Sequence, residues 1–129
     1  MLQRTMIQLY ISDCDEAMKF YQEAFDAKML GDERGDNNLL VHAEMDVFGQ
    51  AIAFSQCGGN DTEEVIVNRA IQFCLHFEKG QIEIGRKAYN ALKNGAIEIS
   101  KFSTDNDGYW GEWSFEVIDK YGVYWCLYC

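Results

Sequence analysis

Two side chains that can move a proton stand two positions apart in the stretch His42-Ala-Glu44. Residues 39–47 alternate between apolar and polar side chains, which is typical of a strand with one buried face. Positions i and i+2 of a strand share a face, so His42 and Glu44 could act on one substrate as a general base and the acid that orients it. The alternative is structural: His42 bonds a neighbouring strand and Glu44 is solvated, because interior histidines are commonly hydrogen-bonded core residues.

Further polar and aromatic residues occupy the same kind of position on other predicted strands. Tyrosine rings there offer stacking surfaces, and amides and thiols offer hydrogen bonds. Trp110 lies in the polar loop 103–111 and is expensive to leave in water, so we expect it in a lid, in the core or in a dimer contact. The predicted ligand-binding residues are Gln8, Tyr10, His42, Glu44, Gln72, Trp110, Tyr124, Cys126 and Tyr128.

The five cysteines show no disulfide framework, and their odd number fits a reducing compartment in which thiols stay free. Cys126 and Cys129 match the spacing C-x-x-C, which in other settings holds zinc or a redox-active disulfide. They fall in a predicted strand, however, where residues three apart point to opposite faces. The spacing therefore predicts neither a zinc site nor a redox site.

The elements that must position these side chains begin at residues 6–27. Ile7, Leu9 and Ile11 alternate with polar residues, as in a half-buried strand. Ser12 and Asp13 then stand where a helix needs its N-cap. The apolar residues that follow have helical spacing: Ala17, Phe20, Tyr21, Ala24 and Phe25. A strand followed by a helix is predicted.

Much of this pattern occurs a second time. Residues 71–73 repeat residues 7–9, residues 87–89 repeat residues 19–21, and residues 119–127 repeat residues 46–54. Three matches in the same order indicate an internal duplication. The prediction is a single domain of two βαβββ modules, at residues 1–57 and 68–129, joined by a glycine-containing polar linker at residues 58–67.

The predicted fold class is α+β, with the tandem modules forming a curved mixed sheet in the shape of a cup. The apolar side of each strand can face a helix, which leaves a polar and aromatic face that is either solvated or curved around a pocket. The register around Phe115 has two alternatives. The duplication matches Glu44 with Val117, whereas simple alternation places Glu116 in the cup.

Composition excludes several classes of function. The chain has 129 residues and a formal net charge of −10, which repels phosphate backbones and anionic membranes, so we expect no nucleic-acid or membrane partner. No stretch approaches the roughly 18 apolar residues of a membrane span, and the N-terminus lacks the apolar run of a signal peptide. The predicted location is the cytoplasm.

Several motifs together resemble a known superfamily. They are the tandem βαβββ pattern, a strand-to-helix transition ending in Phe20-Tyr21, the stretch His42-Ala-Glu-Met45 before a glycine turn, and the final stretch Asp119-Lys-Tyr-Gly-Val-Tyr-Trp125. Over its whole length the chain resembles the vicinal oxygen chelate superfamily of glyoxalase I, the bleomycin-resistance proteins and the extradiol dioxygenases. It is most similar to the PhnB-like branch, for which an H-A-E-L-type strand and a terminal D-x-F-G-V-x-W strand are typical.

The resemblance implies four positions for metal ligands, on the first and last strand of each module. Carried over to this chain, they fall at Gln8 (or Met6), Ala53, Gln72 and Cys126. None is a carboxylate or an imidazole, so the site predicted here has no metal and no cofactor. His42 and Glu44 would add only two donors and hold a divalent ion weakly.

Two functions follow as expectations. The first is a metal-independent, small-molecule binding protein, and the alternative is a lyase, isomerase or dioxygenase-like enzyme with a nonstandard metal site. The resemblance also implies a homodimer, because an open cup leaves strand edges exposed and this superfamily commonly covers them by pairing two chains.

Overall fold

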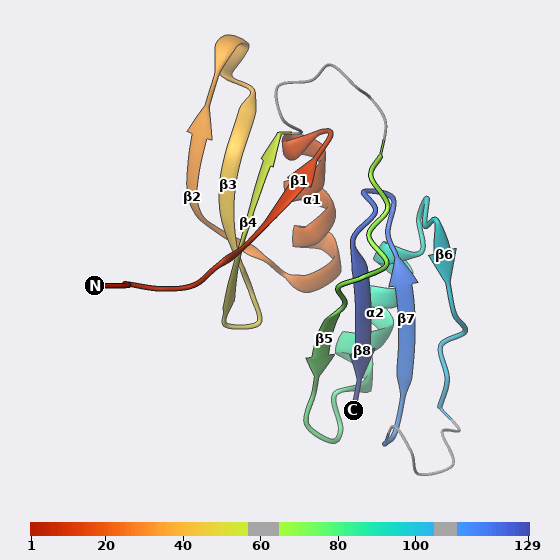
Figure 1. Ribbon diagram of the computed structural model, residues 1–129. Coiled ribbons are helices and arrows are strands. Elements are labelled where there is room, and N and C mark those ends of the chain that lie inside the picture. Colours follow the sequence, from red (N-terminus) through yellow and green to blue (C-terminus); the bar gives the residue numbers. More distant parts are fainter. Residues whose placement is uncertain (57–64, 105–110) are drawn as a thin grey trace. The chain divides into compact units, whose positions relative to one another are not determined.

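The computed structural model describes residues 1–56, 65–104 and 111–129, and the chain divides into two compact units, Met1–Glu64 and Val65–Cys129 (Figure 1). Each unit contains one helix and one four-stranded mixed sheet, in the order βαβββ. The predicted α+β class and the repeated βαβββ topology are confirmed. Trp110 and most of the predicted linker, residues 58–64, lie outside the described residues.

The first unit runs through β1 (Ile7–Ile11), α1 (Cys14–Phe25), β2 (Lys28–Arg34), a 3-10 turn η1 (Asp36–Asn38), β3 (Leu40–Val47) and β4 (Gln50–Gln56). Its strands lie in the order β1-β4-β3-β2. Strand β1 is parallel to β4, and the other neighbours are antiparallel.

The second unit repeats this plan with β5 (Phe73–His76), α2 (Ile82–Leu92), β6 (Glu98–Ile99), β7 (Ser114–Ile118) and β8 (Tyr124–Tyr128). The strand order β5-β8-β7-β6 matches that of the first unit, and β5 is again parallel to the last strand. Neither described helix has the length and hydropathy that crossing a bilayer would need.

Helix α1 forms as the sequence predicts. The carboxylate of Asp13, the N-cap residue, accepts a hydrogen bond of 3.0 Å from the backbone N–H of Glu16. The whole predicted stripe is buried against the sheet: Ala17, Phe20, Tyr21, Ala24 and Phe25. The helix ends at Asp26, whose left-handed backbone terminates the regular hydrogen bonding.

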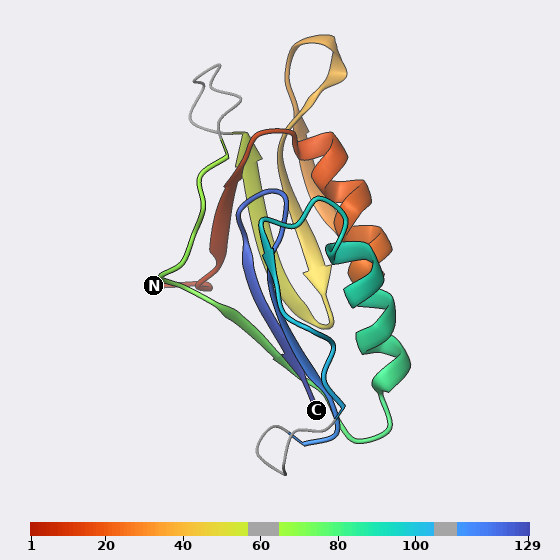
Figure 2. The same cartoon turned by 90° about the vertical axis from the view of Figure 1, so that its right-hand side faces the viewer.

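Helix α2 lies along one face of its own sheet (Figure 2) but packs differently from the prediction. Helical spacing in the second copy predicts a buried stripe of Ile84, Ala88, Tyr89 and Leu92. Ala88 and Leu92 are buried, whereas Ile84 and Tyr89 are only half-buried. The helix approaches the sheet closely at Gly85, where an added Cβ would lie 2.5 Å from the ring of Trp113. Helical periodicity did not reveal this position, because glycine adds no apolar side chain to the stripe.

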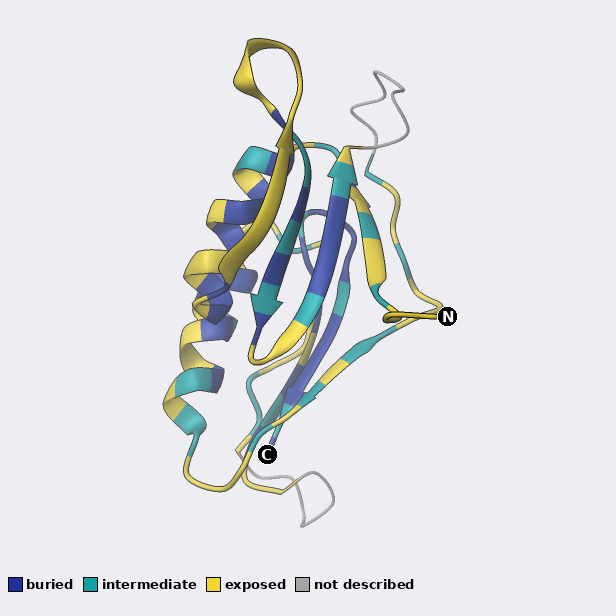
Figure 3. Cartoon of the chain, turned by 90° about the vertical axis from the view of Figure 1, so that its left-hand side faces the viewer, coloured by how far each residue is buried: buried dark blue, intermediate teal, exposed yellow. Residues whose placement is uncertain are grey.

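Each sheet has one face covered by its helix and a second face, called here the helix-free face. The alternation of strand residues assigns side chains to the two faces, as the burial colours in Figure 3 show for β3. Strand β2 differs, since all seven of its residues are exposed and it forms the edge of its sheet. This edge leaves backbone hydrogen-bonding groups available.

A fully buried carboxylate organises the hairpin between β7 and β8. Asp119 accepts hydrogen bonds from the backbone N–H groups of Tyr121 and Val123 and, at 2.8 Å, from the indole Nε1–H of Trp125. The corresponding aspartate of the first unit, Asp46, accepts one bond of 2.7 Å from the backbone N–H of Gly49. The same turn motif therefore makes more contacts in the second unit.

We expect Asp119→Ala to lower the free energy of unfolding of the second unit by roughly 3 kcal/mol or more, because it leaves several buried donors without an acceptor. Asp119→Asn keeps one acceptor oxygen and should lose less. Urea unfolding followed by tryptophan fluorescence measures this unit directly, since all three tryptophans lie in it.

Asp46→Ala is the matched control, and its loss should stay near 1 kcal/mol because it removes a single exposed hydrogen bond. Equal losses for the two alanine variants would show that the buried network does not stabilise the hairpin.

Candidate functional site

The helix-free face of the first sheet carries most of the residues predicted for this unit. Strand pairing aligns Gln8, Ala53 and Glu44 in one row across β1, β4 and β3. Tyr10, Ser55 and His42 form the next row. The prediction that His42 and Glu44 share a face with Gln8 and Tyr10 therefore agrees with the strand register.

The proton-transfer candidates of this face are engaged with other residues. The ring Nδ1 of His42 lies 2.8 Å from the hydroxyl of Ser55, and Arg4 donates to the carboxylate of Glu44 at 2.7 Å. Gln8 donates to the Tyr10 hydroxyl at 3.2 Å. His42 thus bonds a neighbouring strand, as the structural alternative has it, whereas Glu44 is paired with Arg4 and not simply solvated.

The second sheet resolves the register left open by the sequence. Glu116 pairs with Cys126, and Cys126 pairs with Cys74, so these three form a row across β7, β8 and β5. Val117 is buried on the helix side. Simple alternation therefore gives the correct register, and Glu116 is the counterpart of Glu44.

The strand pairing also changes which residue of the second unit is equivalent to Gln8. In the first unit the row partner of Ala53 on the first strand is Gln8, and in the second unit the row partner of Cys126 is Cys74. The repeated sequence placed Gln72 at this position, but β5 begins only at Phe73. The second copy has two more residues before β5 than the short-motif match implies. The residue equivalent to Gln8 is therefore Cys74 and not Gln72.

Gln72 still contributes to the helix-free face. Its amide donates to the Glu116 carboxylate at 3.0 Å, and its carbonyl oxygen lies 3.7 Å from the Cys74 sulfur, which donates to it. At the far end of β5, the rings of His76 and Tyr128 stack with centroids 4.5 Å apart. The predicted residues Gln72, Tyr124, Cys126 and Tyr128 therefore all lie around one sheet.

Burial raises the pKa of two of these groups, a thiol and a phenol. It raises the pKa of the Cys126 thiol to about 12, with Cys74 and Glu116 adding to the effect. Burial, together with the nearby Glu116, also raises the pKa of the Tyr124 phenol. Near neutral pH the face therefore presents a neutral thiol and a neutral phenol beside the Glu116 carboxylate.

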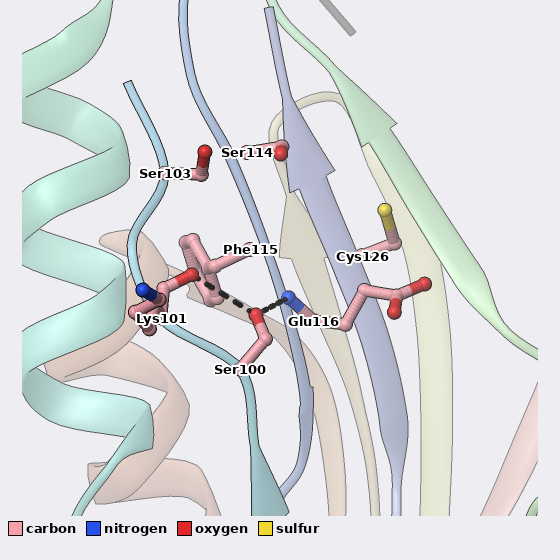
Figure 4. Close-up of a pocket in the computed structure, with 7 residues that line it drawn as sticks. All are labelled: Ser100, Lys101, Ser103, Ser114, Phe115, Glu116 and Cys126. Carbon is pink, nitrogen blue, oxygen red and sulfur yellow. Dashed lines mark hydrogen bonds between the residues drawn. The ribbon is translucent and has the colours of Figure 1, made fainter. Parts of the chain in front are cut away.

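A pocket of about 350 Å³ opens beside this row (Figure 4). Ser100 Oγ accepts a hydrogen bond of 2.8 Å from the backbone N–H of Glu116, which fixes the strand edge against the following loop. A second pocket of about 240 Å³ shares Ser100 and Glu116 and extends to Tyr124. The lining residues of the first pocket are Ser100, Lys101, Ser103, Ser114, Phe115, Glu116 and Cys126.

Sequence reasoning missed most of this lining. The serines come from two segments on either side of one loop, which are joined by an antiparallel bridge between Ser103 and Ser114. The sequence did place Glu116 on this face in one of its two register alternatives. Cys74 is not part of this lining, and its alternation with Phe73 and Leu75 places it on the face of Gln72.

The residues at the four implied ligand positions do not fit a catalytic divalent ion. With the corrected register these positions hold Gln8 and Ala53 in one unit and Cys74 and Cys126 in the other. An amide, a methyl group and two thiols lack the carboxylate and imidazole donors that such sites use. The described residues contain no group of three or more His, Cys, Asp or Glu side chains placed to hold a metal.

Known proteins share both the sequence pattern and the fold. The model of the Glyoxalase/Bleomycin resistance protein/Dioxygenase superfamily matches residues 3–127. An uncharacterised protein of Mycobacterium tuberculosis is 27% identical over 124 residues, which are 92% of this chain and 69% of that protein.

Two solved structures illustrate the similarity of fold. A PhnB protein from Bacillus cereus has a TM-score of 0.75 at 21% identity, covering 98% of both chains. The fosfomycin resistance protein FosX from Listeria monocytogenes has a TM-score of 0.70 at 14% identity, covering 99% of this chain and 94% of FosX. With the family match spanning nearly its whole length, the chain belongs to the glyoxalase/bleomycin resistance/dioxygenase superfamily.

Proposed function

We propose that this protein binds a small molecule on the helix-free face of its second sheet, without the divalent metal chemistry of metal-dependent superfamily members. The observation that carries the proposal is the position of Glu116, which lines two adjoining pockets of about 350 and 240 Å³. Hydroxyl groups and a neutral phenol surround this carboxylate. Such a mixture of a few polar groups in a concave site is typical of small-molecule recognition.

The side chains around the pocket define the kind of ligand, and two of them are charged, Glu116 and Lys101. Glu116 is an acceptor held by Gln72, while Ser100, Ser103 and Ser114 can donate or accept. Tyr124 and Phe115 add aromatic surface. The ligand proposed is therefore an amphipathic molecule that places an amine or another hydrogen-bond donor against Glu116.

The corresponding acid of the first unit is less suited to this role. Glu44 already pairs with Arg4 at 2.7 Å, which offsets its charge, whereas the hydrogen-bond partner of Glu116 is a neutral amide. The enzymatic alternative would have to use Nε2 of His42, because Nδ1 already contacts the Ser55 hydroxyl. The binding function requires no proton transfer.

We expect a screen of amine-bearing aromatic compounds to find ligands that raise the thermal midpoint, because binding to the native state stabilises it. For such a ligand, Glu116→Gln should weaken affinity by about 10- to 100-fold in calorimetry, the usual worth of a charged hydrogen bond. Glu83→Gln on the exposed surface of α2 is the matched control and should bind as the wild type does. Equal affinities for the Glu116 and Glu83 variants would exclude the pocket.

Metal content gives a separate test. We expect protein purified without chelator to contain no stoichiometric manganese, nickel or zinc, because the ligand positions offer amide, methyl and thiol groups. Elemental analysis measures this, and ligand affinity should not change in EDTA. A stoichiometric divalent metal that is lost in Cys74→Ala would restore the metal-dependent enzyme as the better hypothesis.

We further propose that the protein is a homodimer that covers the edge of β2. This strand is exposed along its whole length, and Leu30 on it is 56% exposed. We expect a dimer mass in sedimentation equilibrium at micromolar protein and a weakened dimer in Leu30→Lys, because a charge on a strand edge opposes pairing.

Leu39→Lys serves as the control, since Leu39 is 57% exposed but lies outside the strands. A monomer mass across the concentration range would refute the dimer. A dimer unaffected by Leu30→Lys would place the interface elsewhere.

A further inference from the structure

Two thiols lie side by side on the helix-free face of the second sheet. Cys74 on β5 and Cys126 on β8 are direct partners in a parallel pair of strands. Neighbouring strands are about 4.8 Å apart, and paired residues point to the same side. The two sulfur atoms are therefore presented together by two backbones that the sheet holds in place.

The two thiols differ in their surroundings. Cys74 is exposed, and its S–H donates to the carbonyl oxygen of Gln72 at 3.7 Å. Cys126 is only 5% exposed and lines the 350 Å³ pocket. One sulfur atom is thus reachable from solvent and the other lies deeper, so an ion could arrive at Cys74 and be held by both.

The number of donors limits which ion fits. No third His, Cys, Asp or Glu joins the pair in a metal-binding group within residues 1–56, 65–104 and 111–129. Zinc in a structural site takes four donors, and magnesium or calcium takes six or more oxygen ligands. Two thiolates alone suit a soft ion of low coordination number, the class to which Cu(I) belongs.

We propose that Cys74 and Cys126 form a two-thiolate binding site for Cu(I) on the helix-free face of the second sheet. As two Cu–S bonds form, each thiol releases its proton to solvent, and the copper keeps its oxidation state. The site goes beyond the small-molecule function, because it requires the thiol pair and not the serine-lined pocket. Gln72 can still orient Cys74 through the contact that it makes in the metal-free form.

Proton release gives the site a defined pH dependence. The groups that face Cys126 from the neighbouring strands are Cys74 on β5 and Glu116 on β7, and both disfavour its thiolate. Copper must displace the Cys126 proton, so its apparent affinity should rise about tenfold or more for each pH unit between pH 6 and 8. Binding through a carboxylate and backbone groups alone would show no such rise.

The test is a competition between the reduced full-length chain and a colorimetric Cu(I) chelator under anaerobic conditions. The wild type should withdraw one Cu(I) per chain, and X-ray absorption should show two sulfur neighbours. Cys74→Ser and Cys126→Ser should each lower the affinity for Cu(I) by more than about 100-fold, because each removes a direct ligand. Loss of a residue that only supports a ligand typically costs roughly 10- to 100-fold. Cys74 is exposed, so Cys74→Ser is expected to fold normally.

The remaining cysteines provide matched controls, namely Cys14→Ser, Cys57→Ser and Cys129→Ser, which should retain the ion. The proposal is overturned if the wild type fails to compete for Cu(I), or if any of these variants loses as much affinity as Cys74→Ser. Cys74 does not line the 350 Å³ pocket, so its serine variant should still bind an amine-bearing ligand. Loss of copper with retained ligand, or the reverse, separates this site from the proposed function.

Discussion

The buried carboxylate of Asp119 fixes the position of β8, on which the candidate site depends. It holds the turn through two backbone N–H groups and anchors the indole of Trp125 on the helix side of the sheet. Since residues of a strand alternate between faces, placing Trp125 in the core places Tyr124 and Cys126 on the opposite face. One turn interaction therefore determines both the packing of the core and the chemistry of the helix-free face.

The sequence predicted the topology because periodicity and duplication are local signals. The α1 stripe from Ala17 to Phe25 and the two βαβββ modules could be recognised from spacing alone. The site was harder, because a row across a sheet depends on how strands pair. For that reason the sequence match assigned Gln72 to the position beside Cys126 that Cys74 occupies. The contribution of Ser103 likewise depends on a bridge to Ser114 that no local pattern encodes.

The two units keep the same fold but differ in electrostatics. Glu44 and Glu116 occupy matching rows, yet an arginine neutralises the first and a neutral amide holds the second. Charged groups that keep an unpaired charge beside a pocket attract ligands of opposite charge, whereas an internal ion pair does so weakly. The two units thus share one backbone topology, and the side chains on their helix-free faces support different chemistry.

The contact between Gly85 and Trp113 means that the elements of the two units are no longer interchangeable. When the helices are aligned by their repeated motif, Ala17 of the first unit corresponds to Gly85. When the strands are aligned by Glu44 and Glu116, Val41 corresponds to Trp113. A chimera carrying the first helix on the second sheet would therefore drive a methyl group into the indole. For the same reason, an alanine at position 85 would force either the helix or the indole of Trp113 to move.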